Sequence, residues 1–234
     1  MMSRWNKPSS LFLVLFAASF GPSLTSASSI FQDVTGAAGL SYQHADINVA
    51  TATDMELMSG GAAAGDFDGD GWVDLFVTRV NLPNLLFRNK GDGTFEEVGA
   101  AAGVNLHSNS SGCVWADIDN DGDQDLYVQT FDSRNYLYIN DGAGNFQEQG
   151  IARGVDLERE PGKLYSSSAA FGDADNDGDL DLMSTAWQLG DARAEDPQTR
   201  LYINDGQGNF TDRTEELGLT TLTAGFSPAF ADVD

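Results

Sequence analysis

Residues 65–77 read GDFDGDGWVDLFV and place four aspartates within nine positions, directly before an apolar run. The stretch recurs as ADIDNDGDQDLYV at residues 116–128 and as GDADNDGDLDLMS at residues 172–184, and its beginning returns as ADVD at residues 231–234. The aspartate loops start at residues 66, 117, 173 and 232, so they are 51 to 59 residues apart. Self-similarity at such a period is typical of a repeat protein in which each unit forms one supersecondary structure.

Two further motifs recur with the same spacing. One contains a Gly- and Asp-rich turn and reads NLLFRNKGDGTF at 84–95, NYLYINDGAGNF at 135–146 and TRLYINDGQGNF at 199–210. The other follows it and reads FEEVGAAAGV at 95–104, FQEQGIARGV at 146–155 and FTDRTEELGL at 210–219, with an extra copy, FQDVTGAAGL, at 31–40. Glycine and aspartate between two short apolar runs favour a β-hairpin.

Each unit therefore predicts four short strands. The first precedes the aspartate loop, the second follows it, and the last two flank the Gly-rich turn; helical periodicity is limited to one turn after the last strand. Four strands per unit of roughly 50 residues is typical of a β-propeller blade. We expect an all-β propeller of four-stranded blades, here an N-terminal fragment of about three to four blades. The copy at 31–40 matches the fourth strand of a further blade.

The aspartate loops have the composition of a calcium site. Counted from its first aspartate, the first loop has carboxylates at positions one, three, five and nine, a glycine at six and a backbone carbonyl at seven. Alternate positions of a tightly curled loop point inward, and glycine permits the reversal. The predicted ligands are Asp66, Asp68, Asp70, Trp72 (carbonyl) and Asp74; Asp117, Asp119, Asp121, Asp123 and Asp125; Asp173, Asp175, Asp177, Asp179 and Asp181; and Asp232 and Asp234.

Metals other than calcium, and the EF-hand motif, fit these loops less well. Ca²⁺ accepts six to eight oxygen ligands, whereas Mg²⁺ keeps waters in an octahedron and Zn²⁺ prefers His or Cys. The chain has two histidines and one cysteine, Cys113, which we interpret as a small buried residue. An EF-hand requires Glu at position 12, where this chain has Val77, Val128 and Ser184. A solvated acidic turn is the simplest alternative, but three matched copies favour about one Ca²⁺ per complete loop.

With these motifs in place, the chain resembles the FG-GAP/VCBS repeat family, most of all the cartilage acidic protein type and its bacterial relatives. The resemblance covers about residues 31–234 and rests on D-x-D-x-D-G-x-x-D-L followed by N-x-L-Y-x-N-x-G-x-G-x-F. It implies a seven-bladed, integrin-α-like propeller with calcium in the loops that join the first two strands of each blade. It also implies extracellular adhesion or ligand binding, usually without catalysis.

The N-terminus and the charge indicate where the protein acts. Residues 1–27 combine basic residues, a ten-residue apolar run and small residues near Ala27, which is the pattern of a secretory signal peptide. We therefore expect a secreted or cell-surface protein with the propeller in residues 28–234 and no membrane span in the mature chain. A net charge of −24 disfavours nucleic acid as a partner.

A partner would bind on the propeller face opposite the calcium loops. That face is expected to contain the connections at 78–83, 129–134, 185–198, 41–60, 105–111 and 156–166. Loops on a rigid scaffold often carry function, and aromatic and Arg side chains are common anchors; the candidates are Phe131, Arg134, Lys163, Tyr165, Trp187 and Arg193. The partner would be an extracellular protein or glycan. Two alternatives are a purely structural module and the propeller part of a larger secreted enzyme, for example one that degrades polysaccharides.

Overall fold

The computed structural model describes residues 31–48, 50, 52, 60–131, 134–155, 165–187, 199–219 and 227–231, apart from the side chains of Tyr165 and Trp187. Within these residues, each complete aspartate loop belongs to its own four-stranded antiparallel sheet. The first sheet contains β1 (Ala62–Gly65), β2 (Asp74–Val77), β4 (Leu85–Asn89) and β5 (Phe95–Glu97). The second contains β7 (Ser110–Ala116), β8 (Asp125–Thr130), β9 (Tyr136–Asn140) and β10 (Phe146–Glu148), and the third contains β11 (Tyr165–Gly172), β12 (Asp181–Trp187), β13 (Arg200–Asn204) and β14 (Phe210–Asp212).

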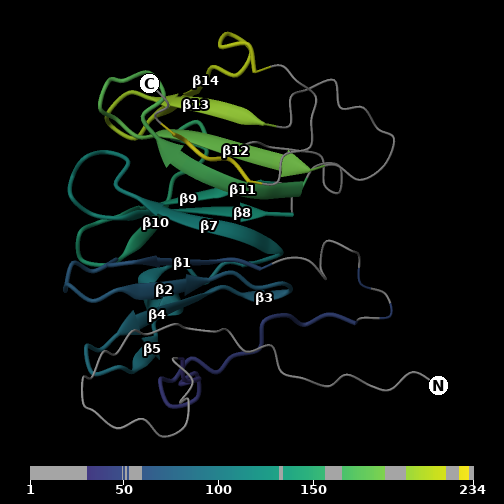
Figure 1. Ribbon diagram of the computed structural model, residues 1–234, viewed down its shortest axis with the longest axis vertical. Helices are drawn as coiled ribbons and strands as arrows, with labels where there is room; N and C mark the ends of the chain where they lie inside the picture. Colours follow the sequence, from purple (N-terminus) through teal and green to yellow (C-terminus); the bar gives the residue numbers. More distant parts are fainter. Residues whose placement is uncertain are drawn as a thin grey trace, which may run out of the picture.

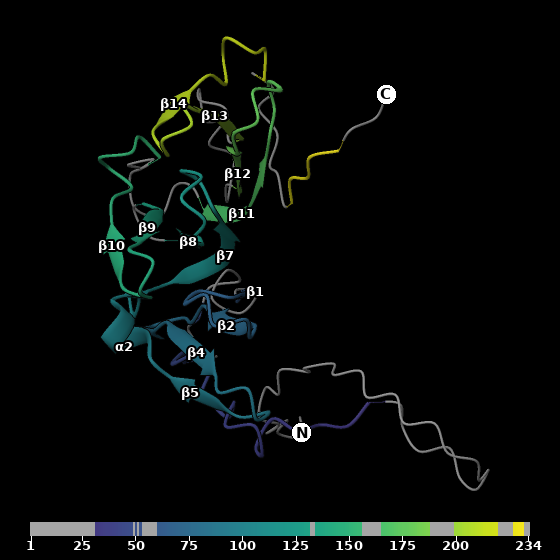
Figure 2. The ribbon, with the colours of Figure 1, turned by 90° about the vertical axis from the view of Figure 1, so that its left-hand side faces the viewer.

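The sheets are arranged as consecutive blades of a partial propeller. They lie one above another in Figure 1, in the order of the sequence. Figure 2 shows that they fan into an arc, with β1, β7 and β11 toward the concave side and β5, β10 and β14 on the convex side. This arrangement confirms the predicted fold class.

The second strands β2 and β8 are covered on both faces: β8 lies between the first and third sheets, and β2 lies between the second sheet and the N-terminal segment around Ala38 and Leu40. All residues of β2 and of β8 are buried. A strand that is covered on both sides reads as a continuous apolar run and does not alternate, which explains the DLFV and DLYV sequences. Two apolar clusters fill the spaces between consecutive sheets, one joining the first sheet to the second and one joining the second to the third.

One aromatic contact repeats between blades. Trp115 of β7 packs edge-on against Phe76 of β2, with ring centroids 6.2 Å apart, and Phe171 of β11 packs in the same way against Tyr127 of β8 at 6.4 Å. A small residue before each loop makes room for this ring, because a Cβ atom at Gly65 would lie 2.8 Å from the Trp115 indole. These contacts fix the spacing of the blades in the arc.

Phe230, directly before the fourth copy of the motif, occupies the position equivalent to Trp115 and Phe171. A Cβ atom at Gly172 would overlap its ring, as one at Gly65 would overlap Trp115. Phe230 therefore lies against the third sheet as Trp115 lies against the first, although residues 227–231 form no strand.

The turn after the fourth strand links each blade to the next. Gly103 and Gly154 both adopt left-handed φ angles, of 84° and 81°, and lie against the carbonyl oxygens of Phe146 and Phe210 in the following sheets. In the first unit this turn is a single helical turn, α2 (Gly99–Ala102), and in the others it is non-helical. Within the described residues, no helix has the length and apolar character needed to cross a membrane.

The copy at 31–40 only partly follows the prediction. Residues 31–34 are not a strand, because a fourth strand needs a third strand beside it and none lies there in the described part of the chain. Its turn is retained, however, since Gly39 lies against the Phe95 carbonyl and Leu40 is buried on the first sheet.

The connection between the second and third strands lies on the same face as the connection between blades, as expected. β3 (Leu82–Pro83), between the second and third strands of the first blade, pairs with β6 (His107–Ser108), which leads into the second blade. The strands are longer than predicted, however. Residues 110–111, 129–130, 165–166 and 185–187, predicted as connections, belong to β7, β8, β11 and β12, because the ladders continue through bulges at Ser110/Gly112 and Ser166/Ser168.

Candidate metal centre

The aspartate loop is held in shape by its own carboxylates. In the second loop, Asp117 accepts hydrogen bonds from the backbone N–H groups of Asp121 and Gly122, both at 3.1 Å. Asp121 in turn accepts from the N–H group of Asp123 at 3.0 Å. Asn120 and Gly122 have φ angles of 59° and 95°. The chain therefore curls around the first carboxylate and brings alternate side chains to the inside.

The first and third loops repeat this geometry. Asp66 accepts from Asp70 at 3.1 Å and Gly71 at 2.8 Å, and Asp173 accepts from Asp177 at 3.1 Å and Gly178 at 3.0 Å. The predicted requirement for glycine at position six is confirmed by the left-handed φ angles there. A second requirement was not predicted: at position four, Gly69, Asn120 and Asn176 are also left-handed. Glycine and asparagine tolerate that conformation best.

The loops bring carboxylates together in groups of three. Each member of a group offers one oxygen, and these oxygens lie within 4.8 Å of one another. The groups are Asp66, Asp68 and Asp70; Asp117, Asp119 and Asp121; and Asp173, Asp175 and Asp181. Several acidic oxygens at such distances can hold a metal ion, since hard cations prefer this donor type.

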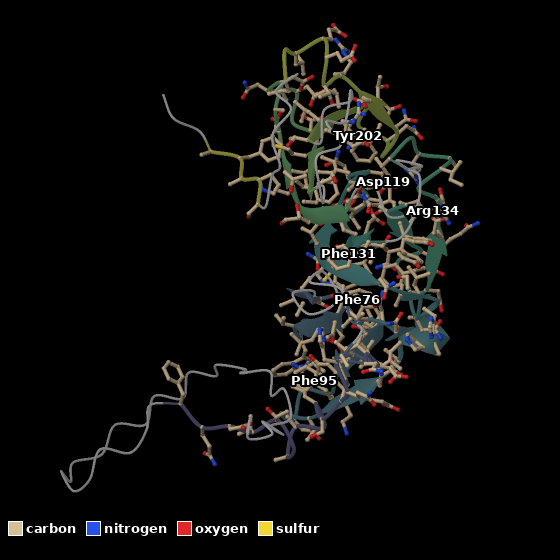
Figure 3. The ribbon with its side chains drawn as sticks, turned by 90° about the vertical axis from the view of Figure 1, so that its right-hand side faces the viewer. Phe76, Phe95, Asp119, Phe131, Arg134 and Tyr202 are labelled. Carbon is tan, nitrogen blue, oxygen red and sulfur yellow. The ribbon has the colours of Figure 1, made fainter. Side chains whose placement is uncertain are left out.

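Asp119 gives a further indication of a cation. Its Oδ1 atom is buried and accepts no hydrogen bond, although a buried polar atom normally has a partner. The pKa of Asp119 is raised, first by desolvation and then by repulsion from Asp121 and Asp117, against the attraction of Arg153. Figure 3 places Asp119 between Tyr202 of the third sheet and Phe76 of the first. A cation beside Oδ1 would satisfy it.

The position-nine aspartates connect the loop to the third strand. Asp125 is 2% exposed and accepts from the backbone N–H groups of Ile118 at 3.3 Å and Asn140 at 2.8 Å. Asp74 and Asp181 have the same pair of contacts in their own blades. Desolvation raises the pKa of Asp74 to about 6 and of Asp125 to about 7, and it raises that of Asp181 as well. Each position-nine carboxylate thus ties loop and hairpin together, whether or not it also contacts a metal.

The position-seven side chains lie over the Gly-rich hairpins. Cβ atoms at Gly91, Gly142 and Gly206 would overlap the side chains of Trp72, Asp123 and Asp179, respectively. Asp179 also accepts from the Asn120 side chain of the second loop at 2.8 Å. The position-seven side chains therefore lie on the hairpins, and the role of the position-seven residues as ligands stays a prediction. The predicted ligands Asp232 and Asp234, like the predicted signal peptide at 1–27, lie outside the described residues.

The asparagine that ends each third strand is a further site residue that was not predicted. The Asn140 side chain donates to the Phe67 carbonyl in the first loop at 2.8 Å and to the Gln124 carbonyl in the second at 3.1 Å. Asn204 does the same between the second and third loops, through the carbonyls of Ile118 at 2.7 Å and Leu180 at 3.1 Å. One buried amide thus connects two consecutive loops. Its recurrence in the YIN sequence is a signal, but its partners are distant in sequence.

Basic side chains contact two of the loops. Arg88 of β4 pairs with Asp68 at 2.5 Å and with Asp70 at 3.2 Å in the first loop. Arg153 pairs with Asp119 at 3.4 Å in the second and also donates to the Gln207 carbonyl of the third blade. These arginines partly neutralise loops that are otherwise strongly acidic.

The residues expected on the opposite face are only partly placed. Arg134 lies over the Tyr136 ring, 4.3 Å from its centroid, and pairs with Glu148 at 3.2 Å, so it already has intramolecular partners. Phe131 is half-buried beside the second blade. Tyr165 and Trp187 are backbone partners at the ends of β11 and β12. Lys163 and Arg193 lie outside the described residues, and the face remains a prediction. Cys113, predicted to be buried, is half-buried and packs against the apolar cluster between the first and second sheets, where desolvation raises the pKa of its thiol to about 12.

Comparison with known proteins gives a consistent picture. The FG-GAP-like repeat family matches residues 66–128 and 117–184. Cartilage acidic protein 1 of Xenopus tropicalis is 29% identical over 142 residues, which make up 58% of this chain and 21% of that protein. The Homo sapiens protein of the same name is 35% identical over 80 residues, or 34% of this chain and 12% of that protein. The chain therefore spans only a small part of the length of these relatives.

One solved structure is similar in part. It concerns specific recognition of non-reducing terminal N-acetylglucosamine by an Agrocybe aegerita lectin. The match covers 73% of this chain and 40% of that chain, with 21% identity and a TM-score of 0.38. Similarity at this level says nothing about the function of this chain.

Proposed function

Because the chain belongs to the FG-GAP-like repeat family, we propose that it is a calcium-binding propeller module of an extracellular protein. Residues 1–27 would direct it out of the cytoplasm, and residues 28–234 would form the propeller. The observation that carries the proposal is the set of three aspartate groups in loops of one geometry, one of which holds the orphaned Asp119 Oδ1 atom.

The donor set fits Ca²⁺. Bound calcium would supply positive charge that offsets the repulsion within the aspartate groups, which join positions one, three and five in the first two loops and positions one, three and nine in the third. The carboxylates would bind it together with the position-seven carbonyl of Trp72, Asp123 or Asp179. The position-nine aspartates, Asp74, Asp125 and Asp181, are proposed as ligands too, and their backbone contacts keep the loop on the hairpin. Because the ion would bind the folded loop and not the unfolded chain, it would stabilise the blades by mass action.

The module is proposed to act without catalysis, as a scaffold for adhesion or ligand binding. The described position-nine aspartates, whose carboxyl pKa values are raised by desolvation, are held by two backbone N–H groups each and are buried between strands. That setting suits a structural role. The partner, an extracellular protein or glycan, would bind the face opposite the loops, and the names of the cartilage acidic relatives favour an extracellular setting.

Calcium titration by calorimetry, together with thermal unfolding in calcium and in chelator, tests the proposal. We expect about three sites and a clear fall in Tm when calcium is removed. Asp121→Ala should remove one site and leave the others, because each loop forms its own group of carboxylates. Glu96→Gln is the matched control, since Glu96 is an exposed acid of β5 outside the loops. Equal stoichiometry in wild type and Asp121→Ala would contradict the assignment.

A further inference from the structure

Arg88 distinguishes the first loop from the other two. It lies one position before the asparagine that ends the third strand, where the second and third blades have Ile139 and Ile203. Its guanidinium reaches across the blade to the first loop, where it pairs with Asp68 and Asp70. Neither isoleucine can make such a contact.

Arg88 occupies the oxygens that the first loop leaves available. Both oxygens of Asp66 accept backbone N–H groups, and Oδ1 of Asp68 and of Asp70 accept from the N–H groups of Asp70 and Trp72. The remaining Oδ2 atoms of Asp68 and Asp70 are the two that Arg88 contacts. A cation bound at this loop would compete for the same two atoms.

The arginine beside the second loop leaves more of the loop's carboxylate oxygens available than Arg88 does. Arg153 contacts only Oδ2 of Asp119 and leaves Oδ1 of that residue buried without a partner. Arg153 is also held by Gln149 and by the Gln207 carbonyl, so its guanidinium is shared. In the third loop, the described residues place no basic side chain in ion-pair contact with the carboxylates.

We infer that Arg88 is a built-in competitor for the cation of the first loop, which makes this loop the weakest of the three calcium sites. The inference rests on the proposed calcium binding. To bind, Ca²⁺ must displace the guanidinium of Arg88, whose side chain is 47% exposed and can swing into solvent. The first site then fills only at calcium concentrations at which the other two are already occupied.

The first loop contains its own reporter. Trp72 occupies position seven, is 51% exposed and lies over Gly91 of the hairpin beside the loop. Its fluorescence should change when calcium binds this loop and displaces Arg88, and the change should be lost in Trp72→Phe. Calorimetry on the same samples gives the number of sites and their affinities, so it shows whether Arg88→Ile tightens the weakest affinity even if the fluorescence is silent.

The test compares the full wild-type chain with Arg88→Ile, which gives the first blade the side chain of the other two. Repulsion between a unit charge and Ca²⁺ about 5 Å apart in water-like surroundings predicts that the substitution tightens the weakest site on the order of tenfold. Arg200→Ala is the control: it removes the same charge from a half-buried pair with Asp212 on the third sheet, away from the first loop. It should change that affinity by less than about twofold, because a charge more than a Debye length away is largely screened.

The results distinguish failure of the Arg88 inference from failure of the proposed calcium binding. If calcium binds at about three sites and Arg88→Ile leaves the weakest site unchanged, the competitor role of Arg88 is wrong and the proposed calcium function stands. If the Trp72 signal titrates as tightly as the other sites in wild type, the ranking of the loops is wrong. If no calcium binds in wild type or in Arg88→Ile, both the inference and the proposed function fail.

Discussion

At the scale of single residues, the position-nine aspartates are buried and yet accept hydrogen bonds that favour their charged form, and these two conditions have opposite effects on the pKa. They are fully or almost fully buried, yet each accepts two backbone hydrogen bonds that a neutral side chain of the same shape would satisfy less well. Burial favours the protonated form and hydrogen bonding favours the carboxylate. The effect of burial is larger than that of the hydrogen bonds, since the pKa values of Asp74 and Asp125 lie above the ordinary 3.8.

The first prediction concerns pH in the absence of calcium. Because the pKa of Asp125 is about 7 in the folded protein against 3.8 normally, the folded state binds this proton more tightly. Its contribution to the free energy of unfolding is therefore fully present below about pH 4 and lost as the pH rises through about 7. Denaturant unfolding in chelator across this range should show stability falling with pH. Asp125→Asn should have a shallower slope, and an unchanged slope would show that another group titrates.

At the scale of elements, the third strand has a larger part than its sequence suggests. It supplies the central pairing of the sheet and ends in an asparagine whose amide reaches two loops in two blades. The loops are thus fixed from outside as well as by their own carboxylates.

The second prediction tests that asparagine. Asn140→Ala leaves the carbonyls of Phe67 and Gln124 without this donor inside the protein, which should lower the free energy of unfolding by about 2–4 kcal/mol. Asn145→Ala is the matched control, because Asn145 is exposed and bonds to Asp141 within the same hairpin. Its loss should cost less than about 1 kcal/mol. Urea unfolding of the wild type, Asn140→Ala and Asn145→Ala measures the two losses of stability. Equal midpoints for the two variants would contradict the proposed bridging role of Asn140.

The same elements show how far the sequence could predict the structure. Strand order, hairpins, loop sides and the glycine at position six follow from local patterns, because turn chemistry and apolar runs act over a few residues. The contacts of Asn140, the Trp115–Phe76 packing and the reach of Arg88 could not be predicted, since each joins residues that are distant in sequence. The strand predicted at 31–34 rested on sequence likeness alone, but a strand forms only where a neighbour pairs with it.

At the scale of the whole molecule, the two interfaces between the three described sheets are built from equivalent residues. The residue at loop position two enters the next blade: Phe67 lies against Gly144 and Ile118 against Gly208. The turn glycine of one blade lies on the phenylalanine carbonyl of the next. The interfaces are therefore close-packed, and small residues at fixed places make the close approach possible.

The third prediction tests this packing. Gly154 and Gly93 have φ angles of 81° and 85°, so alanine is strained at both positions. A Cβ atom at Gly93 meets nothing within 4 Å, whereas one at Gly154 overlaps the Phe210 carbonyl of the third sheet. Gly93→Ala should cost about 1–2 kcal/mol from backbone strain alone. Gly154→Ala should cost about 1–3 kcal/mol more because the blades must separate.

Thermal unfolding of the two glycine variants gives the comparison. Equal losses of Tm would mean that the turn moves aside without disturbing the interface. A larger loss for Gly154→Ala, accompanied by an earlier transition of the third blade in hydrogen exchange, would place the cost at the boundary between the sheets.

The second and third units each have an aromatic ring that packs on the preceding blade and a small residue that accepts the ring of the following blade. Such a unit duplicated in tandem would therefore have both surfaces and could pack against its neighbours without further substitutions. Duplication of a unit would thus preserve the packing between blades. The residue before the strand-ending asparagine, Arg88 in one unit and Ile139 or Ile203 in the others, would set the calcium affinity of each loop separately. The fold thus lets the number of ion sites and their strengths evolve separately.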